Sequence, residues 1–205
     1  MTKTIKWPMG QPMEGSMLQE LGELLDSGEI IVYPTNTLYG IGASIFSSAG
    51  VSRVHQVKER PDGDPFLIMA NESQIRELCH INDLGERFLE RKDILVTGIF
   101  DAKDTAPSHI IHNGTLAVRL PCSVLAASIM EYAGPITSTS ANIHGGRPPS
   151  TCRSAEEQLG EKVRIYIDSG PVNGQPTTLV DFTGVKPKII REGALPSAAV
   201  GEYYG

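Results

Sequence analysis

The sequence predicts an α/β (α+β) fold of three layers, in which about seven strands form one twisted, mixed sheet with helices on both faces. Short β-rich runs alternate with segments of helical periodicity along most of the chain. The last two predicted strands are joined by only a turn, which is typical of an antiparallel pair. Of the 205 residues 40% are hydrophobic, and no linker divides them. We therefore expect residues 1–205 to form a single domain.

Helices are predicted where apolar residues recur every three or four positions, and strands where β-branched and aromatic residues form short runs bounded by Pro or Gly. Ser47 or Ser48 is the expected N-cap of the second helix. The elements expected in the first half are helix Leu18–Leu25, strand Ile30–Tyr33, helix Val51–Val57, strand Phe66–Met69, helices Glu72–His80 and Leu84–Arg91, and strand Ile94–Phe100.

The second half begins with a predicted loop, because Pro107 and Asn113-Gly114 punctuate residues 101–114. Ser154 and Glu157 match a capping box that would open a helix. The other elements expected here are strand Thr115–Leu120, helix Cys122–Tyr132, strand Ile136–Thr139, and the closing strands Val163–Ile167, Thr178–Phe182 and Lys188–Arg191.

Composition excludes several classes of protein. The 18 basic and 24 acidic residues give a net charge of −6, which argues against a basic surface that coats nucleic acid, so any polyanion must meet a few local cations. No apolar run reaches the roughly 20 residues of a spanning helix, so no membrane partner is expected. Three cysteines without a C-x-x-C pair, and no apolar stretch after Met1, favour the cytoplasm.

Known nucleotide and metal motifs are missing from the chain. There is no G-x-x-x-x-G-K-[ST] loop, and no G-x-G-x-x-G follows a predicted strand. His109 and His112 have H-x-x-H spacing but lack an acidic partner, so we interpret them as ordinary surface histidines. No metal site is expected from a direct motif.

Polar residues cluster instead at the ends of predicted strands, where ligands gather in open α/β sheets. Residues 33–42 combine hydroxyls, an amide and glycines, residues 137–142 are rich in hydroxyls, and Arg119 and Arg191 each close an apolar strand. Lys58 and Arg60 are two apart before a proline, and in an extended segment they could point the same way as a phosphate clamp. The pattern indicates a cationic, hydroxyl-lined cleft suited to a nucleoside triphosphate, although each cluster alone also fits an ordinary turn or charged loop.

Five motifs in order resemble the YrdC/YciO superfamily over nearly the whole chain, from Leu18 to Gly193. They are Tyr33–Gly40 (Y-P-T-x-T-x-Y-G), Lys58–Pro61 (K-x-R-P), Ser138–Asn142 (S-x-S-A-N), Pro176–Asp181 (P-[ST]-T-x-V-D) and Ile189–Gly193 (I-[LI]-R-x-G). The resemblance implies a YrdC-like fold and threonylcarbamoyl-AMP synthesis. In that reaction ATP, L-threonine and bicarbonate give threonylcarbamoyl-AMP and pyrophosphate, for the N6-threonylcarbamoyladenosine of tRNA.

The resemblance also implies roles for individual residues. The catalytic set would be Lys58, Arg60, Ser140 and Asn142. The nucleotide would contact those four together with Thr115, Ser138 and Arg191. Threonine would be held by Thr35, Arg119 and Thr177, with Arg119 suited to its carboxylate. ATP is then a substrate, Mg²⁺ is its expected companion, and the partners include tRNA or double-stranded RNA and downstream tRNA-modification proteins.

The sequence departs from the synthase pattern, and the departures keep a second reading open. Asn36 replaces the usual Asp, Asp64 replaces a neutral or basic residue, and Met69 stands where many synthases carry His. Residues 92–97 replace a Trp-Pro-Gly-Pro-Leu-Thr segment, and residues 143–145 (Ile-His-Gly) differ from x-Ser-Gly. Residues 61–63 and 174–178 resemble the YciO branch, so the alternative is a YciO-like paralogue that binds nucleotide or double-stranded RNA with little turnover. A sugar-phosphate lyase would need clustered metal-binding acids, which are not found near these motifs.

Overall fold

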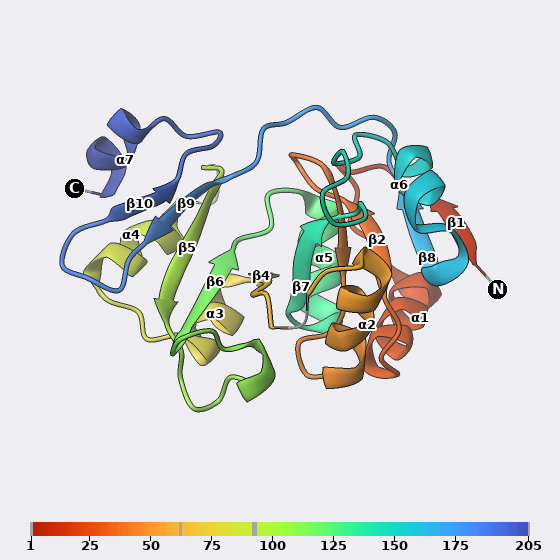
Figure 1. Ribbon diagram of the computed structural model, residues 1–205, viewed down its shortest axis with the longest axis horizontal. Helices are drawn as coiled ribbons and strands as arrows, with labels where there is room; N and C mark the ends of the chain where they lie inside the picture. The colour runs from red at the N-terminus through yellow and green to blue at the C-terminus, as the bar shows by residue number, and fades with distance from the viewer. Residues whose placement is uncertain (1, 62, 92–93, 205) are drawn as a thin grey trace.

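The computed structural model describes residues 2–61, 63–91 and 94–204, where one twisted mixed sheet is flanked by helices (Figure 1). The strands in this part of the chain are β1 (Lys3–Lys6), β2 (Ile31–Pro34), β3 (Tyr39–Gly42), β4 (Leu67–Met69), β5 (Val96–Asp101), β6 (Thr115–Arg119), β7 (Ile136–Ser140), β8 (Ile165–Asp168), β9 (Thr178–Asp181) and β10 (Lys188–Arg191). The helices there are α1 (Gly15–Asp26), α2 (Ser48–Lys58), α3 (Glu72–Leu78), α4 (Asp83–Glu90), α5 (Val124–Ala133), α6 (Cys152–Leu159) and α7 (Ser197–Tyr204), with 3₁₀ turns η1 (Ser108–Ile110) and η2 (Gly160–Lys162).

The mixed sheet is confirmed, but the expected number of about seven strands is wrong, because ten strands within the described residues pair in the order β1-β8-β2-β3-β7-β4-β6-β5-β9-β10. The sequence pattern missed β1 because only Ile5 of its four residues is buried. It missed β3 because two glycines suggested a loop, whereas Gly42 pairs opposite Ile31. A Cβ at Gly42 would lie 2.2 Å from the Thr137 carbonyl oxygen, so the close approach of β7 requires glycine there.

Strand β7 changes its partner along its length. Ile136, Thr137 and Ser138 pair with β4, whereas Thr139 and Ser140 pair with β3, on the opposite edge of β7. The two halves of the sheet therefore meet at β7 (Figure 1). Thr139 and Ser140 pair with β3 on one edge but have no β4 partner on the other edge, which leaves backbone polar groups available for a ligand.

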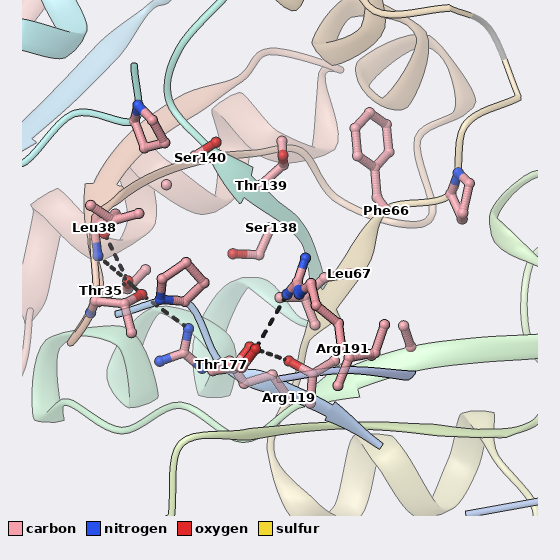
Figure 2. A pocket seen from close by; sticks show the side chains of 18 of the residues that line it. Thr35, Leu38, Phe66, Leu67, Arg119, Ser138, Thr139, Ser140, Thr177 and Arg191 are labelled. Carbon is pink, nitrogen blue, oxygen red and sulfur yellow. Dashed lines mark hydrogen bonds between the residues drawn. The ribbon is translucent and has the colours of Figure 1, made fainter. Parts of the chain in front are cut away.

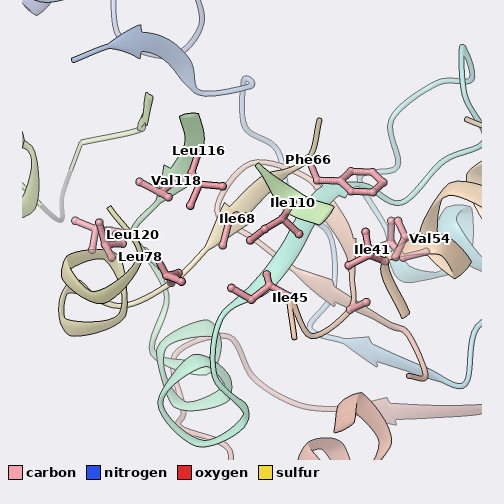
Figure 3. Close-up of a cluster of buried hydrophobic side chains, with 14 of the residues drawn as sticks. Ile41, Ile45, Val54, Phe66, Ile68, Leu78, Ile110, Leu116, Val118 and Leu120 are labelled. Atoms are coloured by element: carbon pink, nitrogen blue, oxygen red, sulfur yellow. The ribbon is translucent and has the colours of Figure 1, made fainter. Parts of the chain in front are cut away.

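Helices cover both faces of the sheet, as expected. In β2 and the residue before it, Ile30 and Val32 belong to one buried cluster, while Ile31 and Tyr33 belong to another. Helices α1 and α5 contribute to the second cluster, and the remaining helices contribute to the first. Figure 3 shows the larger cluster, in which Ile41 and Val54 pack near Phe66 while Leu78 and Val118 lie further along the sheet.

One predicted helix cap is confirmed and one is wrong. The Ser47 hydroxyl accepts a hydrogen bond from the Gly50 amide and caps α2, as predicted. The capping box of α6 is wrong in register, because Thr151 is the N-cap and Ser154 its N3 partner. The Thr151 hydroxyl accepts from the Ser154 amide and the Ser154 hydroxyl accepts from the Thr151 amide, so α6 begins three residues earlier than the predicted box implied.

The closing strands β9 and β10 are antiparallel, as predicted. Helix α7 was not predicted, and it packs through Val200 and Tyr204 against the end of the sheet near Phe182. Among the residues that the structure describes, no helix is long and apolar enough to cross a membrane.

Candidate functional site

A cavity of about 500 Å³ opens beside β7, at the junction of the two halves of the sheet (Figure 2). Its walls come from the turn between β2 and β3, from β4, β5, β6 and β7, and from the segment that leads into β9 and β10. The volume is typical of a pocket for a small molecule or nucleotide. Most of the candidate residues meet here: the lining includes Thr35, Arg60, Thr115, Arg119, Ser138, Ser140, Thr177 and Arg191.

The charge of the cavity is opposite in sign to that of the whole chain. The described residues that line it include Arg60, Arg119 and Arg191, and none of them is Asp or Glu, although the chain carries a net charge of −6. Apolar residues such as Phe66, Leu67 and Ile110 complete one side. A cavity with several guanidinium groups and no carboxylate suits an anion that has an apolar part.

Arg119 is the most deeply buried of these cations, with 4% of its surface exposed at the end of β6. One terminal nitrogen donates a hydrogen bond of 3.4 Å to the Thr37 hydroxyl, and its Nε has no hydrogen-bond partner. No carboxylate within the described residues pairs with it. A buried guanidinium with unused donors is costly unless a ligand supplies the counter-charge.

The turn between β2 and β3 uses its own hydroxyls. Thr35 Oγ1 donates to the Leu38 carbonyl at 2.7 Å and accepts from the Thr37 and Leu38 amides at 3.2 Å. It also lies 3.0 Å from Thr37 Oγ1. Thr35 therefore lies in the cavity wall as predicted, but its hydroxyl mainly fixes the turn that places Thr37 beside Arg119.

Arg60 lies at the other end of the cavity and is held by its own loop. Its Nε is 3.2 Å from the Asp64 carboxylate, and a terminal nitrogen donates to the Pro65 carbonyl at 3.0 Å. The guanidinium also stacks over the Phe66 ring, 4.9 Å from its centroid. These contacts orient Arg60 toward the cavity while Asp64 neutralises part of its charge.

Lys58 does not line the cavity. The extended segment expected here is not found, because α2 continues through Lys58 and Glu59 adopts a left-handed conformation with φ 53°. Lys58 and Arg60 therefore diverge. The Lys58 ammonium donates to the carbonyls of Ser140 and Asn142, the latter at 2.7 Å, and the Lys58 carbonyl accepts from the His144 amide at 2.7 Å. Burial, and then the charge of Arg60, lower the pKa of Lys58 to about 8.

Asn142 lies beside Lys58, and it too is outside the cavity lining. Its amide nitrogen donates to the carbonyls of Ile143 and Gly146 at 2.7 and 3.0 Å, which closes the turn after β7. Its Oδ1 is buried and has no hydrogen-bond partner. Lys58 and Asn142 thus support the Ser140 turn from behind.

Thr177 and Arg191 form the wall opposite β7. The Thr177 hydroxyl is 2.7 Å from the hydroxyl of Thr97 in β5, and the Thr177 carbonyl accepts from Arg191 at 3.3 Å. Before them the chain passes close to the β2–β3 turn, where the Gly174 amide donates to the Thr37 carbonyl at 2.9 Å. A Cβ at Gly174 would lie 2.5 Å from the Asn36 carbonyl oxygen, so glycine is needed there.

Several lining residues were not predicted, among them Thr37, Phe66, Thr97 and His112. Asn113 and Gly114, with φ of 49° and 77°, form a tight turn that returns the chain to β6. His112 and Thr115 pair across this turn, so His112 lies in the cavity wall beside Thr115. The motif Y-P-T-x-T-x-Y-G already contained Thr37, but His112 was interpreted as an ordinary surface histidine, and no motif marked Phe66 or Thr97 as cavity residues.

The positions that depart from the synthase pattern have defined places. Asn36 is exposed and donates to the Cys122 carbonyl at 2.7 Å, and Asp64 pairs with Arg60. Met69 is buried in the core, 3.9 Å from the Tyr33 hydroxyl. Asp62, Lys92 and Asp93 lie outside the described residues. Within the described ranges no group of three or more His, Cys, Asp or Glu side chains could hold a metal ion.

Comparisons with known proteins agree with this fold. The family model Sua5_yciO_yrdC, described as "Telomere recombination", matches residues 23–193. A putative threonylcarbamoyl-AMP synthase of Mycobacterium tuberculosis is 31% identical over 190 residues, which cover 88% of this chain and 86% of that protein. The uncharacterised protein YciO of Escherichia coli is 25% identical over 183 residues, covering 86% and 89% of the two chains.

A solved structure shares the fold over the full length of the chain. The crystal structure of Pyrococcus abyssi Sua5 complexed with L-threonine superposes with a TM-score of 0.88 at 26% identity. The match covers all of this chain and 61% of that longer one. Since the family model matches more than half of the residues, the chain belongs to the Sua5/YciO/YrdC family.

Proposed function

We propose that this protein is an L-threonylcarbamoyl-AMP synthase, a nucleotidyltransferase that converts ATP, L-threonine and bicarbonate to threonylcarbamoyl-AMP and pyrophosphate. The observation that carries the proposal is Arg119, a buried guanidinium in the cavity wall with an unpartnered Nε and no carboxylate partner in the described chain. A substrate carboxylate would supply the missing charge with good geometry. The match to proteins named as synthases, and a relative crystallised with L-threonine, support the same reaction.

The proposal divides the cavity between the two substrates. Threonine would occupy the end formed by Thr35, Arg119 and Thr177. The nucleotide would lie along Thr115, Ser138, Ser140 and Arg191, with its phosphates toward Arg60. Lys58 and Asn142 complete the proposed catalytic set, and their contacts to the turn after β7 hold Ser140 at the cavity.

The chemistry needs no triad. The threonine amine and bicarbonate form an N-carboxylate with loss of water, and one oxygen of this anion attacks the α-phosphorus of ATP. The bond from that phosphorus to the bridging oxygen breaks, and pyrophosphate leaves. The nucleophile is already an anion, so the task of the protein is to position two anions and neutralise phosphoryl charge, which the guanidinium groups of Arg60 and Arg119 can do.

Mg²⁺ belongs to the proposal as the ion that the phosphates of ATP carry. The product is consumed in tRNA modification, so tRNA and downstream modification proteins are the proposed partners.

The test is pyrophosphate release in the presence of ATP, L-threonine and bicarbonate, with each substrate omitted in turn. The proposal expects release that requires all three and that falls strongly in Arg119→Gln. Arg153→Gln, a change at a well-exposed arginine of α6 that pairs with Glu157, serves as the matched control. Release at the level of a buffer blank, or release that is independent of threonine, would refute the synthase.

A YciO-like role as a nucleotide- or double-stranded-RNA-binding paralogue is the second candidate. The observation that favours it is Met69, which is packed in the core where many synthases carry His, together with the similarity to YciO over most of both chains. RNA binding with a steep salt dependence, unaffected by ATP, would support it. An absence of RNA affinity at low salt would exclude the role in binding double-stranded RNA.

A further inference from the structure

Ser138 differs from the Thr35 and Thr115 hydroxyl groups of the cavity in how its hydrogen bonds are arranged. It is buried, with 4% of its surface exposed, and it lies on β7 where that strand still pairs with β4. Its Oγ accepts a hydrogen bond of 2.8 Å from the Tyr33 hydroxyl. In the described part of the chain the Ser138 hydroxyl donates to no protein acceptor, so its proton is available to a ligand (Figure 2).

Neighbouring threonine hydroxyls are engaged within the protein. Thr35 donates to the Leu38 carbonyl, Thr115 donates to the His112 carbonyl, and the hydroxyls of Thr97 and Thr177 bond to each other. A ligand oxygen can take the Thr35 or Thr115 proton only by breaking an existing hydrogen bond, and one proton of the Thr97–Thr177 pair is used within that pair. Ser138 can donate to a ligand without such a loss.

Tyr33 is a fully buried residue of β2. Its hydroxyl has two acceptors within reach, Ser138 Oγ at 2.8 Å and the weaker Met69 sulfur at 3.9 Å. Burial raises the pKa of Tyr33 to about 12, and hydrogen bonding to Ser138 and the charge of Arg119 oppose that rise only in part. The phenol therefore stays protonated, and remains a donor, at neutral pH.

We infer that Tyr33 is a positioning residue that makes Ser138 a fixed donor to an anionic oxygen of the bound substrate. Because the tyrosine proton occupies one lone pair of Ser138 Oγ, the serine proton is directed away from Tyr33 and into the cavity. Arg119 lies close enough for its charge to act on Tyr33, so the donor and the guanidinium can serve neighbouring anionic groups. Tyr33 itself does not line the cavity, which makes its role indirect.

Binding measurements on three variants test this inference, which rests on the proposed function for its ligands. Tyr33→Phe, Ser138→Ala and the double variant are titrated separately with ATP and with L-threonine by calorimetry. We expect each single variant to weaken binding of at least one ligand about 10-fold, and the double variant to bind no more weakly than Ser138→Ala. Loss in the ATP titration identifies a phosphoryl oxygen as the acceptor, and loss in the threonine titration identifies the carboxylate.

Tyr166→Phe is the matched control, because Tyr166 is a fully buried tyrosine of β8 that donates to the Gly160 carbonyl at 2.7 Å outside the cavity. It removes one buried tyrosine hydrogen bond and should leave ligand binding at the wild-type level. Wild-type binding by Tyr33→Phe, or losses that multiply in the double variant, would overturn the inference.

A crystal structure of ligand-free Tyr33→Phe separates this inference from the proposed function. Without the phenol, Ser138 Oγ would face an apolar ring edge, and we expect it to turn to another rotamer. A serine unchanged in position would contradict the positioning role even if the protein bound neither ATP nor threonine. A rotated serine in a protein that binds neither ligand would sustain the positioning role and refute the synthase.

Discussion

The cavity has two ends that are built differently. The inner end is lined by Thr37, Arg119 and Ser138, with Tyr33 behind Ser138, and all four residues are buried on strands or in the β2–β3 turn. The outer end is lined by Arg60, which lies on the loop after α2, and its partner Asp64 lies on the same loop outside the lining; both are more exposed. Arg119 has no acidic partner in the described chain, whereas Arg60 is 3.2 Å from Asp64.

The two ends therefore differ in whether the arginine already has a counter-charge: Arg119 has none in the described chain, whereas Arg60 is paired with Asp64. Keeping an unpaired guanidinium buried costs stability, so the inner end is built for a ligand that supplies the opposite charge. At the outer end a partly exposed ion pair contributes little energy, and a ligand phosphate can replace the internal carboxylate with small cost. The inner end should therefore determine whether substrate binds at all, and the outer end should adjust how tightly.

The largest expected effect is at the inner end. Arg119→Gln should lower kcat/KM for threonine by about 100-fold, because a charge-assisted contact to the carboxylate is lost. The measurement is pyrophosphate release against threonine concentration. The free energy of unfolding in urea should stay level or rise, because a buried unpaired charge is removed. A change in kcat/KM of less than about threefold would contradict the distinction between the two ends. A decrease in the free energy of unfolding would contradict it as well.

At the outer end, Arg60→Gln should raise the KM for ATP about 10-fold and leave the KM for threonine nearly unchanged. The physical reason is that Arg60 faces the proposed phosphate side of the cavity. Steady-state kinetics at two salt concentrations checks it, and the salt dependence of ATP binding should become weaker in the variant. Equal increases in both KM values would show that the ends are not separate.

Lys58 supports the Ser140 turn from behind the cavity, and its lowered pKa predicts a pH effect. Between pH 8 and 10.5 the folded protein binds fewer protons at Lys58 than the unfolded chain does. Wild-type stability should therefore rise with pH across this window relative to Lys58→Met, by on the order of 1 kcal/mol. Urea unfolding of both proteins at pH 7.5, 9 and 10.5 measures it. Parallel curves would mean that the ammonium has no lowered pKa.

The smallest effect should come from Asp64→Asn. Removing this carboxylate releases Arg60 Nε, so the KM for ATP should fall about twofold to threefold, with stability changed by less than about 0.5 kcal/mol. The kinetic assay used for Arg60→Gln applies here as well. A rise in KM as large as that of Arg60→Gln would show that Asp64 orients Arg60 for the ligand rather than competing with it.

The sequence predicted the strands that are both apolar and flanked by turns, such as β6, β7 and the β9–β10 pair. It missed β1 and β3 because an edge strand with one buried residue and a strand with two glycines lack the usual pattern. Gly42 of β3 is required because a Cβ there would meet the carbonyl oxygen of Thr137, a residue far away in the sequence. Such long-range contacts are not visible in a local pattern.

For the site, motif positions predicted which residues meet but not what each side chain contacts. Arg119 and Ser138 are in the cavity wall, as their places at strand ends suggested. Lys58 diverges from Arg60 because α2 extends to Lys58 and Glu59 is left-handed, and no residue preference signalled that. His112 lines the cavity because of the turn at Asn113-Gly114, which the sequence marked only as a loop.

The most direct test of the central claim is a crystal structure of the protein with L-threonine. We expect the threonine carboxylate within hydrogen-bond distance, about 2.7–3.2 Å, of Arg119 Nε, the donor that has no partner in the described chain. Threonine bound elsewhere, or an empty cavity at a threonine concentration that saturates activity, would contradict it.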